Sequence, residues 1–548
     1  MSFAARPGTL SAILAALLVH LALVLPADPA DLSPWVLLRF PLELPAVLLI
    51  LMATGRTRAR PVVRLGVTLI LTLLVVLKLA DLVMKQVLGR PFNPVADLSL
   101  TDALARLIAG SFGVGAAVVS VALAAVWLLA VAALLWWATG VWSRLALPIR
   151  WPADLALACV ALIVLQLSGR TGDWRLPHGT DATRFMVDRA ALLRRTMGDL
   201  AAFRQVAARD PLADAPGLLD AIDRDVLVIF VESYGRTSYD RPFYAGTHLA
   251  TLRRAEADLA QTGLAMRSGF LTSPTRGGQS WLTHTTFANG LWADDQSRYL
   301  AVLSSGRQSL FHQAERAGFR TAAVMPAITM PWPEAARMGF QRVFAAADLG
   351  YRGKPFNWVT MPDQFTLAAT DRLLRDGRDP RRLFAQIALI SSHAPWVPVP
   401  ALVGWAEVGD GRIFERMAVA GDPPSVVWKD PARVRDQYRQ SIDYALQTVM
   451  SYAALQAKDP PLMIVLGDHQ AVAGIALDDR REVPVHVIGP KALVERTAAW
   501  GLTPGLIPAA DAPAIPMQDM RDMILRTFTD PDPQGPAAVR ADGAESPA

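Results

Sequence analysis

Four short motifs of this sequence carry side chains that bind metal ions or attack phosphorus. The motifs VESYG, GGQSWLTH, SSHAPW and LGDHQ contribute Glu232, Ser280, His393 and the adjacent pair Asp468 and His469. Carboxylates and imidazoles are ligands for divalent cations. A serine hydroxyl just inside a helix amino terminus, beside free backbone N–H groups, is well placed to attack a phosphate. These residue types therefore indicate metal-assisted chemistry on a phosphate ester.

Each motif alone has a simpler structural explanation. A glutamate at a strand end is commonly a helix cap or an ion-pair partner, and an Asp-His dipeptide is frequent in proteins. A Gly-Gly-x-Ser sequence is often only a turn followed by a helix cap. Taken together, however, the motifs form an ordered set in which each member follows a strand or opens a helix. This combination favours a functional site.

The motifs stand beside segments that are typical of buried strands. Residues 226–231 (VLVIFV) are apolar and rich in β-branched side chains, and Glu232 follows them directly. Further strands are predicted at 321–325, 384–390, 462–466 and 483–488. Helix-like runs alternate with these strands, which predicts one α/β domain with a mostly parallel central sheet. Ligands and metals gather at the carboxyl edge of such sheets.

The first third of the chain has a different composition. The whole sequence is 52% hydrophobic and only 19% charged, and the apolar excess is concentrated before residue 170. Apolar stretches there cover 10–25, 36–52, 65–84, 114–137 and 153–167. Because a spanning helix needs about 20 apolar residues, this pattern predicts a five-helix transmembrane domain in which the first and last spans are short.

Basic residues in the short loops predict the orientation of the five spans. Four arginines lie in the second loop, between 56 and 64, and Arg144 and Arg150 lie in the fourth loop. The positive-inside rule then places the amino terminus in the cytoplasm and everything beyond Arg170 outside the cytoplasmic membrane. Alternatively, the first segment is a signal peptide cleaved near residues 27–30. The loss of one span would then reverse the agreement between the arginine-rich loops and the positive-inside rule.

Charges and cysteine content limit the alternatives. The net charge is +5 with much of the basic excess in membrane loops, so nucleic acid is not an expected partner. The single cysteine, Cys159, excludes an intrachain disulfide and a thiolate metal cluster. Two charge pairs at helical spacing, Arg39 with Glu43 and Lys78 with Asp81, are expected either to neutralise themselves within the spans or to line a path for a lipid headgroup.

These patterns predict four regions in the chain. The transmembrane domain covers 1–168, and a linker at 169–224 contains an amphipathic juxtamembrane helix. The α/β catalytic domain covers 225–529. The tail at 530–548 has no apolar periodicity and is expected to be disordered.

The motifs resemble those of the alkaline phosphatase and sulfatase superfamily. More closely, the chain resembles the membrane-anchored branch that contains lipoteichoic acid synthase and the phosphoethanolamine transferases. In that branch a strand ends in a metal-binding glutamate, matched by Glu232, and a Gly-Asp-His motif supplies two ligands, matched by Asp468 and His469. The nucleophile that follows a glycine-rich turn is matched by Ser280, and a substrate-contacting histidine is matched by His393.

Two departures from this branch bear on the assignment. Ser280 stands where the branch usually has threonine, and serine keeps the hydroxyl that the chemistry needs. Thr272 and Thr275 are close enough in sequence to be rival nucleophiles. The sequence from Thr272 to Arg276 is similar to the sulfatase maturation signature, but that signature begins with Cys or Ser. Phosphoethanolamine transferases commonly carry disulfides that this chain cannot form, which favours the synthase-like side.

The resemblance implies one divalent ion, Zn²⁺ or Mn²⁺, bound by Glu232, Ser280, Asp468 and His469. It implies that Ser280 is the catalytic nucleophile, with His393, Arg276 and Trp332 as substrate-binding residues. His284, one turn after Ser280, is either a packing residue or a substrate contact, and His486, in an apolar strand, is expected in the core.

The expected activity is transfer of a phosphoryl headgroup (phosphoglycerol or phosphoethanolamine) from a membrane phospholipid to a glycan or another envelope acceptor, through a covalent serine intermediate. A sulfatase-like hydrolase or phosphodiesterase on the same fold is the alternative. A non-catalytic membrane scaffold is the third possibility.

Overall fold

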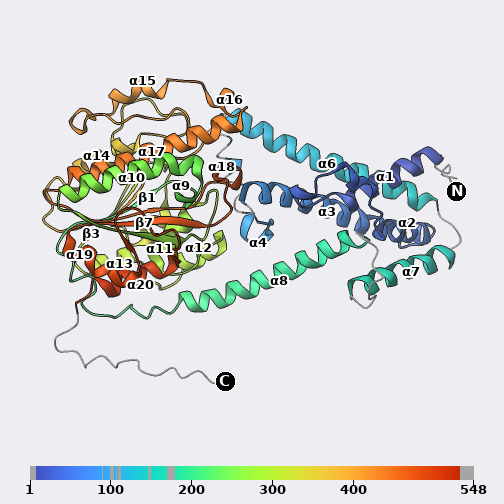
Figure 1. Cartoon of the computed structure of the whole chain (residues 1–548). Helices are drawn as coiled ribbons and strands as arrows, with labels where there is room; N and C mark the ends of the chain where they lie inside the picture. Colours follow the sequence, from blue (N-terminus) through green and yellow to red (C-terminus); the bar gives the residue numbers. More distant parts are fainter. Residues whose placement is uncertain are drawn as a thin grey trace. The chain divides into compact units, whose positions relative to one another are not determined.

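The structure is a computed structural model of the chain (Figure 1). It describes residues 8–88, 90–98, 113–145, 150–168 and 179–530, together with positions 101, 104, 105 and 108. The chain forms two compact units, Met1–Ala202 and Phe203–Ala548, called here the helical unit and the α/β unit. The predicted tail beyond residue 530 and residues 169–178 of the predicted linker lie outside the described residues.

In the described part of the helical unit, two helices are long and apolar enough to cross a membrane. They cover Arg60–Gln86 within α3 (Arg60–Leu88) and Val114–Arg144, which is α6. The other apolar helices are shorter: α1 (Thr9–Val24), α2 (Glu43–Thr54) and α7 (Arg150–Leu167). The 3₁₀-helices η1 (Pro29–Asp31) and η2 (Pro34–Leu38), the short α4 (Pro94–Asp97) and most of α8 (Asp181–Ala207) complete the described elements of this unit.

The predicted second span, 36–52, is not one helix. The backbone leaves η2 at Arg39 in an extended conformation, and α2 begins only at Glu43. Pro41 in the connection cannot donate a backbone hydrogen bond, which is consistent with a break there. The stretch therefore divides into a 3₁₀ turn and a 12-residue helix.

The two predicted charge pairs are also wrong, because all four side chains bind other partners. Arg39 lies outside α2, next to Asp31 and Asp181, and Glu43 accepts hydrogen bonds from Thr183. Lys78 donates to the carbonyl of Leu23, while Asp81 pairs with Arg189 and accepts from the backbone of Phe92. Tertiary contacts with α1 and α8 therefore replace the contacts expected along one helix face.

The α/β unit is built on a nine-stranded mixed sheet in the order β4-β3-β5-β1-β6-β7-β2-β8, with β9 also paired to β2. The strands are β1 (Val226–Val231), β2 (Ala265–Thr272), β3 (Arg320–Met325), β4 (Arg342–Ala345), β5 (Leu383–Ala388), β6 (Leu462–Gly467), β7 (Glu482–Gly489), β8 (Thr503–Pro504) and β9 (Ala514–Pro516). Strands β4, β3, β5, β1 and β6 are parallel, whereas β7 runs antiparallel to both β6 and β2. The sheet is thus mostly parallel at its centre, with an antiparallel side.

Helices cover both faces of this sheet (Figure 1). The longer helices of the unit are α10 (Pro242–Gln261), α11 (Ser280–Asn289), α12 (Gln296–Leu303), α13 (Leu310–Arg316), α14 (Asp363–Leu374), α17 (Pro431–Leu455) and α20 (Met520–Thr527). Short helices are α9 (Thr237–Asp240), α15 (Glu415–Ala418), α16 (Pro424–Val427), α18 (Ala473–Ala476) and α19 (Lys491–Arg496).

Alternate residues of β1 enter different cores. Leu227, Ile229 and Val231 pack with the cluster that includes residues of α10, α14 and α17. Val226, Val228 and Phe230 pack with residues of α11, α13 and α20. Burial on both faces explains why β1 is apolar throughout.

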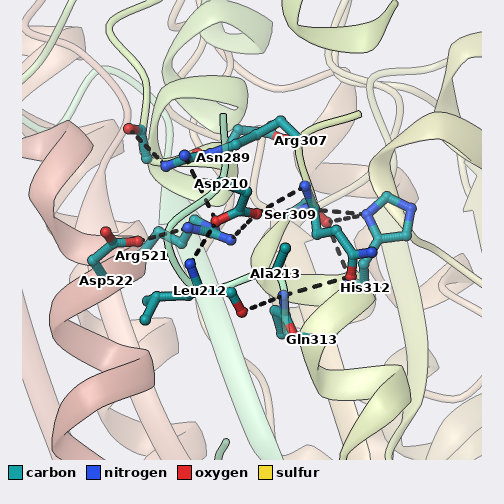
Figure 2. Close-up of polar contacts among 12 residues, drawn as sticks. Asp210, Leu212, Ala213, Asn289, Arg307, Ser309, His312, Gln313, Arg521 and Asp522 are labelled. Carbon is teal, nitrogen blue, oxygen red and sulfur yellow. Dashed lines mark hydrogen bonds and ion pairs between the residues drawn. The ribbon is translucent and has the colours of Figure 1, made fainter. Parts of the chain in front are cut away.

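A buried ion-pair network fixes the segment after α8 within the α/β unit (Figure 2). Asp210 accepts from Arg521 at 2.6 Å and lies 3.7 Å from Arg307. Arg307 also donates to the backbone carbonyls of Arg209 and Asn289. Because Arg521 is fully buried, its guanidinium requires compensating charge, which Asp210 and Asp522 supply together.

Candidate metal centre

Glu232 is positioned by the end of the central strand β1. The parallel neighbours β5 and β6 hold β1 on both sides, so its carboxyl end lies at the edge where ligands gather. Ser233 follows with a φ of 58°, a left-handed conformation that ends the strand abruptly. The backbone carbonyl of Glu232 accepts from the Ser392 hydroxyl at 2.6 Å, which ties this turn to the segment after β5.

Asp468 and His469 follow the neighbouring strand β6. Gly467 is required here, since a Cβ on this residue would come 1.9 Å from the carbonyl oxygen of Tyr234. The close approach brings Asp468 beside the turn after β1, where its Oδ1 accepts from the Ser233 backbone N–H at 2.8 Å. His469 donates from Nδ1 to the Gln470 carbonyl at 3.2 Å, which leaves the Nε2 lone pair free to face the cluster.

Ser280 is the first residue of α11, after a turn of three residues with positive φ. Gly277, Gly278 and Gln279 have φ values of 74°, 143° and 67°. Glycine has no steric penalty in this region, so the two glycines allow the sharp entry into the helix. The backbone N–H of Gly277 donates to the Gln470 carbonyl at 2.8 Å, which holds the turn against the residue after His469.

These three segments bring four predicted site residues together. The Ser280 hydroxyl donates to Glu232 Oε2 at 3.2 Å and lies 3.3 Å from His469 Nε2. His469 Nε2 is 3.4 Å from Glu232 Oε1 and 3.6 Å from Asp468 Oδ2. One ligand atom from each of Glu232, Asp468 and His469 lies within 4.8 Å of the others.

The electrostatics of the cluster fit a bound cation. Burial raises the pKa of Asp468 to about 6, and the nearby Glu232 carboxylate contributes to the shift. Burial opposes a charge on His469, but the Asp468 and Glu232 carboxylates raise its pKa above the usual value. In the part of the chain that the structure describes, no Lys or Arg forms an ion pair with either carboxylate. Two buried carboxylates without a basic partner, beside an imidazole and a hydroxyl, form a suitable donor set for a divalent ion.

The rival hydroxyls have different surroundings. Thr275 is buried and its Oγ1 lies 3.1 Å from Thr283 Oγ1, while Thr272 is the last residue of β2. Ser280, by contrast, contacts both Glu232 and His469. The geometry therefore favours Ser280 as the nucleophile.

Trp358, which no sequence motif indicated, packs on His393. His393 lies in the segment after β5. Its Nδ1 donates to the Ala394 carbonyl at 2.7 Å, and burial lowers the pKa of His393. The Trp358 ring stacks on the imidazole with the ring centres 4.1 Å apart. Trp358 stands in an irregular segment, PFNWVT, with no strand or helix periodicity, so no sequence pattern connected it to His393.

The structure does not bring the remaining two predicted substrate-binding residues into contact with the cluster. The Arg276 guanidinium donates to the carbonyl of Asp479. Trp332 caps the 3₁₀-helix η3 (Pro333–Met338), where its indole N–H donates to the Tyr299 hydroxyl at 3.4 Å and its ring packs near Phe340. A substrate role for either residue remains a prediction.

Two further histidines are buried. His284 lies against the Phe230 ring, with the ring centres 4.3 Å apart, and burial lowers the pKa of His284 to about 4. The structure confirms that His486 is a core histidine, since it is fully buried in β7 between the Ser268 and Tyr234 hydroxyls.

Comparisons with known proteins identify the α/β unit. Residues 224–483 match the family model described as Sulfatase. No curated protein sequence matches the chain.

Solved structures similar to the chain include the lipoteichoic acid synthase LtaP from Listeria monocytogenes, with 11% identity and a TM-score of 0.38 over 60% of this chain and 78% of that one. The C-terminal periplasmic domain of EcEptC from Escherichia coli has 13% identity and a TM-score of 0.35 over 55% and 82%. The phosphoglycerol transferase GacH from Streptococcus pyogenes, in complex with sn-glycerol-1-phosphate, has 12% identity and a TM-score of 0.33 over 61% and 92%. Through the Sulfatase match, the α/β unit of this chain belongs to the sulfatase/alkaline phosphatase superfamily.

Proposed function

We propose that this protein transfers a phosphoryl headgroup, of the phosphoglycerol or phosphoethanolamine type, from a membrane phospholipid to an extracytoplasmic acceptor such as a glycan. The observation that carries the proposal is the position of Ser280 at the start of α11, with its hydroxyl in contact with both Glu232 and His469. An accompanying unit with two helices of spanning length and composition supports a lipid as the donor.

In the first half-reaction, Ser280 Oγ attacks the phosphorus of the headgroup phosphodiester. An Oγ–P bond forms and the bond from phosphorus to the diacylglycerol oxygen breaks. The hydroxyl proton leaves toward Glu232 Oε2, 3.2 Å away, and the departing oxygen takes a proton from solvent. Backbone N–H groups at the start of α11 are oriented to bind the phosphoryl oxygens.

In the second half-reaction, an acceptor hydroxyl oxygen attacks the same phosphorus and the Oγ–P bond breaks. Ser280 Oγ takes back the proton held by Glu232 Oε2. His393 is the candidate base: its Nδ1 proton is committed to the Ala394 carbonyl, and its lowered pKa keeps Nε2 unprotonated near neutral pH. Positioned bases of this kind contribute about 10²–10⁴-fold to such steps. Trp358, stacked on the imidazole, fixes the ring plane.

The expected cofactor is one divalent ion, Zn²⁺ or Mn²⁺, held by Glu232, Asp468, His469 and the Ser280 oxygen. When bound, such an ion supplies Lewis-acid chemistry, lowering the pKa of the serine hydroxyl and neutralising charge on the phosphoryl group. Ligand atoms within 4.8 Å of one another support this assignment.

The proposed location is the outer face of the cytoplasmic membrane. Five spans, three of them formed by the shorter apolar elements, would place the α/β unit on the side opposite to the amino terminus. Arginines at both ends of the loop between α2 and α3 support a cytoplasmic position for that loop.

The test uses full-length protein in detergent with headgroup-labelled phosphatidylglycerol or phosphatidylethanolamine, with and without a purified envelope glycan fraction. We expect headgroup release that accelerates with the acceptor and is lost in Ser280→Ala. Ser304→Ala, at the end of α12, is the matched control and should be fully active.

The alternative hydrolase gives a different result in this assay. If the headgroup is released equally fast without any acceptor, water resolves the intermediate and the transferase proposal fails. A non-catalytic scaffold would bind less than about one divalent ion per chain, and its function in cells would survive Ser280→Ala.

A further inference from the structure

The helical unit contains a cavity where basic side chains gather beside apolar residues. Its volume is about 370 Å³, and it is lined by the end of α1, the segment between α1 and α2, the middle of α3 and the first turns of α8. Three of its lining residues are basic: Arg39, Lys78 and Arg184. They lie within one unit of the protein and are separate from the metal centre.

Lys78 is a buried ammonium with unused hydrogen-bonding capacity. The residue is only 3% exposed, and its Nζ donates to the Leu23 carbonyl at the end of α1 at 2.7 Å. An ammonium has three N–H groups. Within the described residues this is the one hydrogen bond of Nζ, so two donors remain for a ligand. A charge buried among apolar helices commonly marks a functional site.

The two arginines also have donors to spare. The Arg39 guanidinium lies 3.8 Å from Asp31 and 3.9 Å from Asp181, which is too long for hydrogen bonds. The Arg184 side chain makes neither a hydrogen bond nor an ion pair with any residue that the structure describes. Three cations with free N–H groups at one cavity are suited to a phosphate, whose oxygens accept several charge-assisted hydrogen bonds.

An apolar groove continues from this cavity. The groove has a volume of about 420 Å³ and shares Val24, Leu25 and Pro26 with the cavity. Its lining is apolar apart from Ser33, and it includes Leu32 and Leu37, whose exposed fractions are 63% and 54%. A charged cavity joined to an apolar groove matches a molecule with a charged head and a hydrocarbon chain.

We propose that the cavity and the groove together bind one glycerophospholipid. Its phosphodiester lies on Arg39, Lys78 and Arg184, and one acyl chain follows the groove. The site requires no reaction by the α/β unit, so it goes beyond the proposed transfer reaction and does not depend on it.

Carboxylates in the cavity indicate which headgroup fits better. The cavity is also lined by three aspartates, Asp31, Asp181 and Asp188, whose negative charges balance the three cations. A headgroup that carries both a phosphate and an ammonium keeps this balance, whereas phosphatidylglycerol adds an uncompensated negative charge. We therefore expect phosphatidylethanolamine to bind more tightly than phosphatidylglycerol.

Native mass spectrometry of the full-length Ser280→Ala protein in detergent tests the site without turnover. The probes are phosphatidylethanolamine, phosphatidylglycerol and diacylglycerol with the same acyl chains. The double variant Arg39→Gln/Arg184→Gln removes two cations, and Arg195→Gln, an exposed arginine further along α8, is the matched control. Lys78→Met provides a second, independent variant.

The expected result is one phosphatidylethanolamine per chain, with binding about tenfold weaker in the double variant and in Lys78→Met and unchanged in Arg195→Gln. Diacylglycerol should bind at least about tenfold more weakly than phosphatidylethanolamine, because it lacks the phosphodiester. Equal binding of diacylglycerol, tighter binding of phosphatidylglycerol, or unchanged binding in the double variant would overturn the proposal. None of these outcomes depends on whether the α/β unit catalyses transfer.

Discussion

The ligand side chains of the candidate metal centre hold protons more tightly than usual, and a cation competes with these protons. Burial and the Glu232 carboxylate raise the pKa of Asp468 to about 6, and the neighbouring carboxylates raise the pKa of His469 despite its burial. Metals bind the deprotonated forms of both groups. The affinity of the centre for a divalent ion should therefore fall in mildly acidic solution.

Thermal unfolding of EDTA-treated protein, with and without Zn²⁺ or Mn²⁺, should reveal this competition. Because the folded-state pKa of Asp468 is raised, its contribution to the stability of the metal-free protein is present below about pH 3.9 and is lost as the pH rises through about 6. We expect the metal-induced increase in Tm to be larger at pH 7.5 than at pH 5.5. Asp468→Asn should greatly reduce the increase at both pH values, and an equal increase in the unmodified protein at both would contradict the assignment.

A covalent intermediate on Ser280 is the second expectation at this scale. Ser280 is the hydroxyl that contacts both Glu232 and His469. Acid quenching during turnover of a phospholipid donor, followed by peptide mass spectrometry, should locate a phosphoryl adduct on this residue. The adduct should be absent in Ser280→Ala, and an adduct on Thr275 or Thr272 would refute the assignment.

Trp358 provides a prediction that the sequence did not offer. Its ring stacks on His393, so Trp358→Ala should let the imidazole rotate and lower kcat/KM about 10-fold to 100-fold. Trp358→Phe keeps an aromatic ring and should restore most of the activity, while metal content stays unchanged in both variants. Equal loss of activity in the two variants would show that stacking on His393 is not the cause.

The sequence could predict those site residues that directly follow a strand, but not those whose positions depend on distant contacts. Glu232 and Asp468 follow continuous apolar runs whose pairing brings them to one edge, so their proximity was predictable. The orientation of the Arg276 side chain depends on a contact with Asp479, and that of the Trp332 side chain on a contact with Tyr299. Both partners are distant in sequence. No local pattern encodes such contacts.

At the scale of elements, apolar runs predicted strands β1, β3, β5, β6 and β7 within a few residues. β2 was missed because Arg267, Ser268 and Gly269 interrupt its apolar character. A Cβ at Gly269 would come 2.5 Å from Leu502 Cδ2, so a larger residue there would require the Leu502 side chain to shift. An apolar run does not encode strand direction, so the antiparallel pairing of β7 was also not predictable.

The ion-pair network in Figure 2 gives the prediction at this scale. Asp210 and Arg521 are 4% and 0% exposed in their side chains, and they join the segment after α8 to α20. Asp210→Ala leaves the buried Arg307 without its ion-pair partner and removes one of the two carboxylates that pair with Arg521, the other being Asp522. Breaking a buried ion pair in this way costs about 3–5 kcal/mol. Urea unfolding of the full-length protein in detergent, followed by the fluorescence of its tryptophans, should show this loss.

Asp422→Ala is the matched control for this variant. Asp422 pairs with Arg433, and both side chains are about half exposed, so its removal should change stability by less than about 1 kcal/mol. If Asp210→Ala unfolds at the same urea concentration as Asp422→Ala, the network does not stabilise the α/β unit.

At the scale of the whole molecule, the topology of the membrane region remains the decisive prediction. Two helices of spanning length lie among the described residues, and two spans would return the chain to the side from which it started. Five spans would instead place the α/β unit opposite to the amino terminus. The proline-containing break before α2 shortens that helix without changing the apolar composition of the stretch. Apolar composition alone therefore did not predict the helix length.

Cysteine labelling can separate these topologies because the chain has one native cysteine, Cys159. In a Cys159→Ser background, Arg378→Cys places a thiol on the α/β unit at a side chain that is 90% exposed. Ala59→Cys places one in the exposed loop between α2 and α3 without removing its arginines. With five spans, a membrane-impermeant maleimide should label Arg378→Cys in intact spheroplasts and Ala59→Cys only after lysis. Protection of Arg378→Cys until lysis would place the metal centre in the cytoplasm, where an envelope acceptor could not reach it.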